Sequence, residues 1–467
     1  MFQRTVQIIA NLFVSIATSS LFAQPEPKSW SVDEVQQILK KRIEIDKQSV
    51  GIVVGLINGK GNKIIGHGSL RKGDGTNKPT GDTVFEIGST TKVFTSLLLA
   101  DMVQRGDVAL SDPASKYLPN SVTIPSHKGR EITLLDLATH TSALPRLPTN
   151  LSPADAHNPY ADYSVKQMFA FLSGYKLTRS IGEKYEYSNL GAGLLGHILA
   201  LRANTDYETL VATRICKPLG MTSTSIALTS DMKKRLAMGH NETLTETKNW
   251  DIPTLAGAGA IRSNVNDMLR FVEANMGKTQ SSLDDAMAMQ QTTRNATDQP
   301  NMSMALGWHK LTKFGSEVIW HNGQTGGYHS FIGFDKKRGV GVVVLSNAAL
   351  DIDDIGLHLL DSRYALKTLQ PKQERTAIKI DTKVLDGYVG DYELAPTFVI
   401  SITKVDDRLM LQATGQPKFE IFAESEKKFF LKVVDAQITF VKNDEGAVTQ
   451  LILHQNGANQ PAKRRSP

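Results

Sequence analysis

The fold of this chain is decided by the stretch Phe85-Glu86-Ile87-Gly88-Ser89-Thr90-Thr91-Lys92-Val93-Phe94. Apolar residues then recur at helical spacing as far as Met102, and Gly106 supplies a C-terminal stop. This pattern predicts a buried helix that opens at Ser89, with Lys92 one turn away on the same face. A serine hydroxyl is a poor nucleophile until a neighbour accepts its proton, and Lys92 is placed to be that neighbour. A serine at a helix start can equally be a simple N-cap, so this segment alone leaves both interpretations open.

A second element supports the first, because the spacing Ser-x-x-Lys by itself occurs six times in the 467 residues. Among the 11 tyrosines only Tyr187 is followed two residues later by an asparagine, Asn189. A tyrosine can act as a base only if its pKa falls from about 10 towards 7, which requires roughly 4 kcal/mol of phenolate stabilisation. One ammonium about 4 Å away supplies energy of that order, and Lys92 is the candidate. Burial opposes this shift, so a shared-proton network is the alternative to a free phenolate.

A third element is the segment Trp320-His321-Asn322-Gly323-Gln324-Thr325-Gly326-Gly327-Tyr328. It lies in a β context, and its glycines allow a substrate to approach the backbone closely. A lone histidine at a strand end is more often structural than functional. His321 is a candidate site residue only because the elements around Ser89 and Tyr187 are also present.

Composition excludes several classes of protein. The chain is 40% hydrophobic and 21% charged, as soluble globular proteins are, and its net charge of +6 includes three charges in the last five residues. No basic stripe with interleaved aromatic residues is present, so nucleic acid is not an expected partner. The single cysteine, Cys216, excludes an internal disulfide and any multi-cysteine metal site. Motifs of α/β-hydrolases, zincins, P-loop enzymes and dinucleotide oxidoreductases are absent, so we expect neither cofactor nor metal.

The order of the patterns predicts an α+β fold. Residues 49–69 alternate around a Gly/Asn turn as a β-hairpin, residues 89–277 are rich in helical periodicity, and β patterns return from Glu317, followed by a closing helix at 354–366. One antiparallel sheet built from both ends and flanked by helices, with a helical subdomain beside it, satisfies this order. After a polar, proline-containing break come short strands about ten residues apart, which predict a small all-β barrel-like domain.

The N-terminus is typical of a secretory signal peptide. Arg4 precedes an apolar stretch that is too short for a comfortable membrane span and that ends near Ala23. This pattern predicts that residues 1–23 are removed and that the mature protein is periplasmic or secreted and has no membrane span. The sequence assigns no oligomeric state.

In the order Ser89, Tyr187, His321, the three elements resemble the serine β-lactamase and penicillin-binding-protein superfamily, in particular the branch with class C β-lactamases, D-peptidases and related esterases. The resemblance implies the domains: a β-lactamase-like hydrolase at 24–369, a linker at 370–380, a lipocalin-like β domain at 381–457 and a basic tail at 458–467.

The same resemblance implies roles for the residues. Ser89 would be the acylated nucleophile, Lys92 and Tyr187 the proton-transfer pair, and Asn189 the ligand of the substrate amide. The backbone N–H groups of Ser89 and Gln324 would form the oxyanion hole. His321 and Gly323 would complete the substrate site.

His321 also marks a departure, because relatives often carry Lys-Thr-Gly at this place and this chain has no such motif. A histidine is charged only below about pH 6.5, unlike the lysine that binds a substrate carboxylate. The first expectation is an exported serine hydrolase in which Ser89 is acylated by β-lactam or D-amino-acid-containing amide substrates. A D-stereospecific peptidase or carboxypeptidase, a carboxylesterase, and a penicillin-binding module that acylates without efficient turnover are the alternatives.

Overall fold

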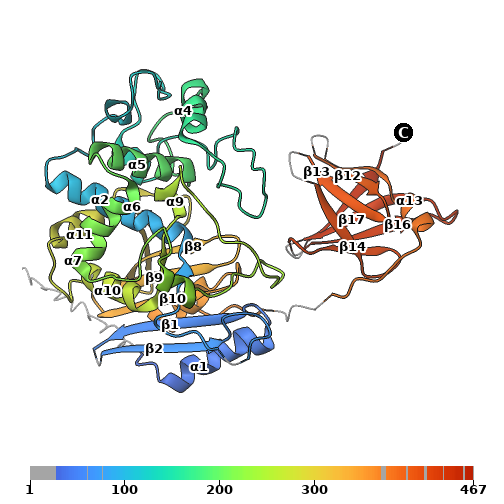
Figure 1. Cartoon of the computed structure of the whole chain (residues 1–467), viewed down its shortest axis with the longest axis horizontal. Helices are drawn as coiled ribbons and strands as arrows, with labels where there is room; N and C mark the ends of the chain where they lie inside the picture. The colour runs from blue at the N-terminus through green and yellow to red at the C-terminus, as the bar shows by residue number, and fades with distance from the viewer. Residues whose placement is uncertain are drawn as a thin grey trace, which may run out of the picture.

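The computed structural model of the chain describes residues 28–59, 61–75, 77–369, 375–395, 398–414, 418–434, 436–455 and 458–465 (Figure 1). The predicted signal peptide and residues 370–374 of the predicted linker lie outside the described residues. Within the described ranges, no helix combines the length and the apolar character that crossing a membrane requires.

An eight-stranded antiparallel sheet is the centre of the N-terminal unit (residues 28–369), and it is built from both ends of that unit, as predicted. The hairpin of β1 (Gly51–Asn58) and β2 (Gly61–Gly68) pairs through β1 with the late strand β10 (Val340–Ser346). The sheet continues through β9 (His329–Asp335), β8 (Ser316–Gln324), β7 (His309–Lys313), β6 (Met302–Met304) and β5 (Asn295–Ala296). The last three strands precede residue 317, where β structure was expected to return, and are too short to give an alternating pattern.

Different helices cover the two faces of the sheet, because side chains alternate along each strand. On β1, Val53 and Ile57 belong to one buried cluster, whereas Ile52 and Val54 belong to the other. The second cluster includes residues of α1 (Val32–Lys40), which lies below β1 and β2 in Figure 1, and of α12 (Asp353–Leu360). The first cluster joins the sheet to the helical layer. Since both faces are covered, β1 is almost continuously apolar.

The helix α2 (Thr91–Gln104) occupies the interior of the helical layer and follows the 3₁₀ turn η2 (Gly88–Thr90). Every residue of α2 up to Met102 is buried, so the helix is packed on all sides. Its polar groups have partners: the Thr95 hydroxyl, for example, donates to the carbonyl of Gly257 at 2.7 Å. The buried helix expected to open at Ser89 is therefore present, with a first turn tighter than an α-helix.

The remaining helices of this layer are α3 (Leu134–Ala138), α4 (Val165–Gly174), α5 (Asn189–Arg202), α6 (Tyr207–Val211), α7 (Lys217–Leu219), α8 (Ser230–Arg235), α9 (Ala256–Gly259), α10 (Val265–Asn275) and α11 (Asp284–Gln290), with a short two-stranded sheet of β3 (Phe85–Glu86) and β4 (Arg262–Ser263). The closing helix predicted at 354–366 is α12 and ends at Leu360. Asp361 is extended there, because its carboxylate is held by Arg338 at 2.9 Å and by Arg363 at 2.5 Å.

The C-terminal unit is a closed barrel whose strands follow one another in sequence order, and this confirms the predicted small all-β fold. After the helix α13 (Thr382–Asp386), its strands are β11 (Gly390–Ala395), β12 (Phe398–Val405), β13 (Arg408–Ala413), β14 (Lys418–Ala423), β15 (Lys428–Leu431), β16 (Ala436–Lys442), β17 (Val448–Gln455) and β18 (Ala458–Arg464). Aromatic side chains fill the interior, where the rings of Tyr388 and Phe440 stack at 4.2 Å.

Residues 458–467, predicted to be a basic tail, instead contain the strand that closes the barrel. β18 pairs with β17 on one side and with β11 on the other, and Ala462 is fully buried. The strand was missed because its sequence is basic rather than apolar. One of its basic side chains has a partner in the barrel, since the Arg464 guanidinium donates to the Gly387 carbonyl at 3.2 Å.

The predicted linker, residues 370–380, is also shorter than expected. Arg375 pairs with Glu424 at 2.8 Å, and the Ile378 N–H donates to the Ala423 carbonyl at 2.9 Å. Residues 375–380 are therefore attached to the barrel at the end of β14.

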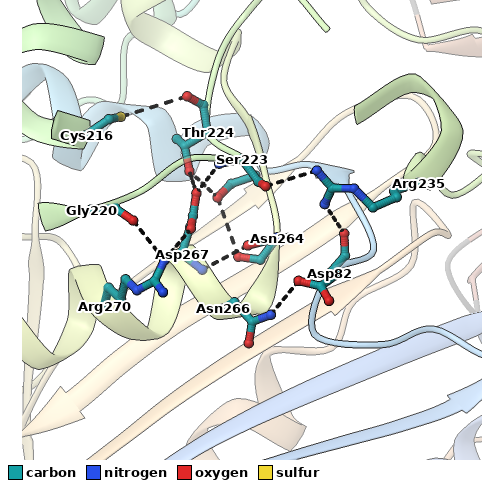
Figure 2. A network of polar contacts seen from close by, with 11 residues as sticks. Asp82, Cys216, Gly220, Ser223, Thr224, Arg235, Asn264, Asn266, Asp267 and Arg270 are labelled. Atoms are coloured by element: carbon teal, nitrogen blue, oxygen red, sulfur yellow. Dashed lines mark hydrogen bonds and ion pairs between the residues drawn. The ribbon is translucent and has the colours of Figure 1, made fainter. Parts of the chain in front are cut away.

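A buried carboxylate fixes the N-terminal end of α10 to the loop between α7 and α8 (Figure 2). Asp267, which is 1% exposed, accepts hydrogen bonds from the Ser223 N–H at 2.7 Å and the Thr224 hydroxyl at 2.8 Å. The Asn264 side chain accepts from the Asp267 N–H at 2.8 Å as the N-cap of the helix. Arg270 contributes an ion pair at 3.2 Å. This network holds α10 in place against the sheet.

We therefore expect Asp267→Ala to lower the free energy of unfolding by about 3 kcal/mol, because two buried donors lose a charged acceptor. All four tryptophans lie before residue 370, so tryptophan fluorescence during urea unfolding reports on this unit. The exposed Asp285 on α11 is the control, and Asp285→Ala should cost under about 1 kcal/mol. Equal losses in the two variants would contradict this account of Asp267.

Candidate active site

Ser89 and Lys92 lie together at the start of the central helix. Lys92 Nζ is hydrogen-bonded to Ser89 Oγ at 2.8 Å and donates to the carbonyl of Ala258, on α9, at 2.6 Å. Lys92 is only 2% exposed, whereas Ser89 is half-buried and lines a cavity. The predicted neighbour of the serine is therefore in contact with it, on the inner side away from solvent.

Two glycines bring the end of β8 against the turn that carries Ser89. A Cβ at Gly88, where φ is +49°, would lie 2.7 Å from the Gln324 nitrogen. A Cβ at Gly323 would lie 2.0 Å from the Ile87 carbonyl oxygen and 2.8 Å from the Ser89 nitrogen. No side chain fits into either gap. The backbones of Ser89 and Gln324, the predicted oxyanion donors, therefore run beside each other at the edge of the cavity.

Tyr187 approaches from the loop before α5. Ser188 caps that helix: its hydroxyl accepts from the Gly191 N–H at 2.9 Å and donates to the Pro145 carbonyl at 2.7 Å. The His140 ring lies 4.5 Å from the Tyr187 ring, and Lys92 Nζ lies 4.8 Å from its centre. The three residues that the motifs predicted as catalytic thus converge from segments about 100 residues apart.

The electrostatics of this trio differ from the sequence-based expectation. Burial, and then the nearby charge of Arg146, holds the pKa of Lys92 well below its usual value. Burial raises the pKa of Tyr187 to about 12, although a hydrogen bond to Ser89 and the Arg146 charge oppose the rise. A Lys92 ammonium was expected to pull Tyr187 towards deprotonation; desolvation instead favours a neutral amine beside a protonated phenol.

A cavity of about 740 Å³ opens in front of Ser89, large enough for a small molecule or a short peptide. Tyr187, Asn189, Gly323 and Gln324 also line it. The Asn189 Oδ1 is buried and has no hydrogen-bond partner within the described residues, so it is available to a ligand donor.

His321 is not part of this lining. It is fully buried, and its Nδ1 lies 2.5 Å from the carbonyl oxygen of Asn322. Its ring stacks on His309 at 5.0 Å. Burial, followed by the charges of His309 and Lys92, holds the pKa of His321 well below its usual value. The imidazole therefore lies behind the cavity wall, in its neutral form.

Sequence reasoning missed several residues of the cavity. Arg146 and Tyr160 line it from the loop between α3 and α4, Trp250 lines it from the loop before α9, and none of the three belongs to a motif that the sequence analysis used. Val433 and Val434 come from the barrel, in the turn between β15 and β16. The carbonyl of Lys432 in that turn accepts from the Thr243 hydroxyl at 2.6 Å and from the Asn241 amide at 3.3 Å. A contact across nearly 200 residues of sequence leaves no local signal.

One group of possible metal ligands borders the cavity. One ligand atom from each of His329, Asp351 and Asp353 lies within 4.8 Å of the others. Asp353, however, already accepts from the Asn322 amide at 2.5 Å and pairs with His329 at 3.1 Å, and Asp351 forms an ion pair with Lys367. These contacts account for the group as a tie between β8, β9 and the start of α12.

Comparisons with known proteins identify the families that the two units resemble. The profile of the Beta-lactamase family matches residues 35–359, and that of a domain of unknown function, DUF3471, matches residues 374–464. The D-alanyl-D-alanine-carboxypeptidase/endopeptidase AmpH of Escherichia coli K12 is 29% identical over 357 residues, covering 73% of this chain and 91% of AmpH. A Beta-lactamase of Pseudomonas fluorescens is 26% identical, covering 67% and 94%. The octameric penicillin-binding protein homologue of Pyrococcus abyssi has a similar structure, with a TM-score of 0.64, 20% identity, and coverage of 93% of this chain and 100% of that one.

The buried histidines predict a loss of stability in acid. Burial lowers the pKa of His309 from 6.5 to about 4. Between pH 6.5 and pH 4, His309 is therefore protonated in the unfolded chain but stays neutral in the folded chain. The stabilising contribution is complete above pH 6.5 and is lost as the pH falls towards 4. Between pH 7 and pH 4.5, we expect the free energy of unfolding to fall by about 2–3 kcal/mol less in His309→Gln than in the wild type. Urea unfolding at both pH values measures this, with the exposed His157→Gln as control; an unchanged pH dependence in His309→Gln would reject it.

Proposed function

The chain belongs to the beta-lactamase family of serine hydrolases, and we propose that Ser89, Lys92 and Tyr187 carry out its acyl transfer on β-lactam or D-amino-acid-containing amide substrates. The observation that carries the proposal is the 2.8 Å hydrogen bond between Ser89 Oγ and the Lys92 amine, whose pKa is held well below its usual value by burial. A neutral amine in contact with a serine hydroxyl is the arrangement that a general base requires.

In the acylation step, Lys92 Nζ takes the proton of Ser89 Oγ as the oxygen bonds to the substrate carbonyl carbon. The negative charge that develops on the carbonyl oxygen is stabilised by the N–H groups of Ser89 and Gln324, each worth about 3–4 kcal/mol in comparable sites. Tyr187 donates its proton to the leaving nitrogen as the C–N bond breaks, and the Lys92 ammonium returns a proton to Tyr187. Over the whole step, Ser89 has lost one proton, the leaving amine has gained one, and Lys92 and Tyr187 have returned to their starting protonation states.

In the deacylation step, water attacks the acyl carbon along the reverse route. Tyr187 and Lys92 accept the proton of the water and return it to Ser89 Oγ as the ester bond breaks. Because Tyr187 has a pKa of about 12, it acts by relaying protons in contact with Lys92 and Ser89 rather than as a standing phenolate.

The remaining predicted residues fall into two groups. Asn189 lines the cavity, its Oδ1 has no hydrogen-bond partner among the described residues, and it would accept a hydrogen bond from a substrate amide N–H. Gly323 and Gln324 would hold the backbone of β8 beside the nucleophile and along the substrate. His321 is better suited to supporting this strand than to contacting substrate, because it is fully buried.

Among the substrate classes we place β-lactam hydrolysis first. AmpH, a carboxypeptidase and endopeptidase by name, favours D-peptides as the rival substrate, and an ester remains compatible with the same chemistry. A penicillin-binding module that stays acylated is the alternative from a different class. We also propose that the mature protein is periplasmic or secreted, on the apolar N-terminal stretch that ends near Ala23, and that the barrel is lipocalin-like.

Covalent labelling tests the nucleophile. A fluorescent penicillin should label the wild type, and Ser89→Ala should lose labelling because it removes the hydroxyl that Lys92 contacts. Persistent labelling of Ser89→Ala would remove Ser89 from this role. A turnover panel of a chromogenic cephalosporin, a D-Ala-D-Ala peptide, a D-amino-acid amide and a short-chain ester then ranks the substrates, and hydrolysis of the ester alone would overturn the β-lactam and D-amide assignment.

Tyr187→Phe tests the proton relay. The phenyl ring keeps the contacts with His140 and Lys92 but has no proton to transfer, so kcat/KM on the best substrate of the panel should fall by roughly 10²- to 10⁴-fold. Stopped-flow acylation and deacylation rates locate the affected step. The control is Tyr175→Phe on the helical layer, and near wild-type turnover by Tyr187→Phe would exclude Tyr187 from the mechanism.

A further inference from the structure

We propose that Arg146 binds a carboxylate of the substrate, and that it supplies the cation which the absent Lys-Thr-Gly lysine supplies in other members of the family. The inference rests on the proposed function and adds a substrate feature to it: a carboxylate placed within reach of the acylated carbonyl.

The position of Arg146 is fixed by its backbone. The Arg146 carbonyl accepts from the Asn189 N–H at 3.0 Å and from the Leu190 N–H at 3.3 Å, which ties the loop to the first turn of α5. The guanidinium carbon lies 5.2 Å from the centre of the Tyr187 ring. Arg146 therefore lies beside Tyr187 and Asn189 in the cavity wall.

The guanidinium is available to a ligand. Arg146 is exposed and lines the 740 Å³ cavity that contains Ser89. Within the part of the chain that the structure describes, no carboxylate or carbonyl accepts a hydrogen bond from it. It is also the sole lysine or arginine among the described residues of the cavity lining. Its planar fork of N–H groups suits two-pronged recognition of a carboxylate.

The histidines near the cavity are poor alternatives for this task. His321, which stands where the lysine of Lys-Thr-Gly would be, is 0% exposed and stacks on His309 behind the wall. His309 does line the cavity, but burial lowers its pKa to about 4, so it is neutral at neutral pH. In members of the family with Lys-Thr-Gly, the cation belongs to the segment that corresponds to the end of β8. In this chain we assign that task to Arg146, in the loop that is tied to α5.

A bound carboxylate would also act on the proton transfer. The Arg146 charge is one of the two causes that lower the pKa of Lys92. A carboxylate on Arg146 offsets that charge, so the pKa of Lys92 rises and the amine becomes a stronger proton acceptor when such a substrate is in place. Substrates with a carboxylate would thus gain in acylation as well as in binding.

Two boronic acids test the proposal, because a boronic acid forms a tetrahedral adduct with an active serine without being turned over. Phenylboronic acid is neutral, and 3-carboxyphenylboronic acid adds a carboxylate to the same ring. The measured quantity is the ratio of their inhibition constants, determined for each variant at fixed ionic strength. The neutral probe reports on the serine and on folding in every variant, so the ratio isolates the carboxylate.

In the wild type, the carboxylated probe should bind more tightly. Arg146→Gln should reduce that preference by roughly 10- to 100-fold, as expected for a charge-assisted hydrogen bond, and Arg146→Lys should keep part of it. The control is Lys234→Ala, which removes one charge from an exposed position of α8 outside the cavity lining and should leave the ratio unchanged.

Two outcomes would overturn the proposal in distinguishable ways. If both probes inhibit and Arg146→Gln leaves their ratio at the wild-type value, Arg146 does not bind the carboxylate, while the serine mechanism stands. If neither probe inhibits the wild type and penicillin does not label it, the proposed function fails, and this inference fails with it.

Discussion

The proposed active site of this protein depends on the burial of one amino group. Lys92 lies in the packed interior, with the Ser89 hydroxyl and the Ala258 carbonyl as its polar contacts. An ammonium ion there would be poorly solvated, so the surroundings favour the neutral amine. A lysine on the surface would be a cation, whereas this one can accept a proton beside a serine. The chemistry of the site follows from where α2 runs through the molecule.

A steric constraint gives the site its shape. The last residues of β8 lie against the turn before α2, and the contact requires glycine at both Gly88 and Gly323. The hydroxyl of Ser330 on β9 secures the same junction by donating to the Ile87 carbonyl at 2.8 Å. The sheet and the central helix therefore meet at Ser89, the proposed nucleophile. The two halves of the fold cannot shift against each other without moving the proposed oxyanion donors.

Charge is separated by depth across the site. His140 and His321 are buried behind the cavity wall, His309 is buried within that wall, and burial lowers the pKa of each of them. Arg146 faces the cavity and remains charged, since an arginine keeps its proton in proteins. The interior around Lys92 and Tyr187 is thus a neutral hydrogen-bonded cluster, with one fixed cation at its outer edge. This division allows proton transfer inside and recognition of an anion outside.

Much of the architecture could be predicted because its signals are local. The hairpin around Asn58, the helix after Ser89 and the short strands of the barrel each show their periodicity within a window of a few residues. Elements with weak local signals were missed. β5 to β7 are too short to alternate, and β18 has a basic sequence in which Arg464 is held by the carbonyl of Gly387, far away in the sequence.

The sequence by itself determined which residues to propose for the site, because the order and spacing of the three motifs point to Ser89, Lys92, Tyr187 and Asn189, and the structure brings these residues close together. Only the tertiary structure decided their protonation, the exclusion of His321 from the cavity, and the entry of Arg146, Val433 and Val434 into it. The reason is physical. A pKa depends on how far a group is removed from water, and a cavity wall depends on which distant segments pack together. Neither quantity is contained in a local stretch of sequence.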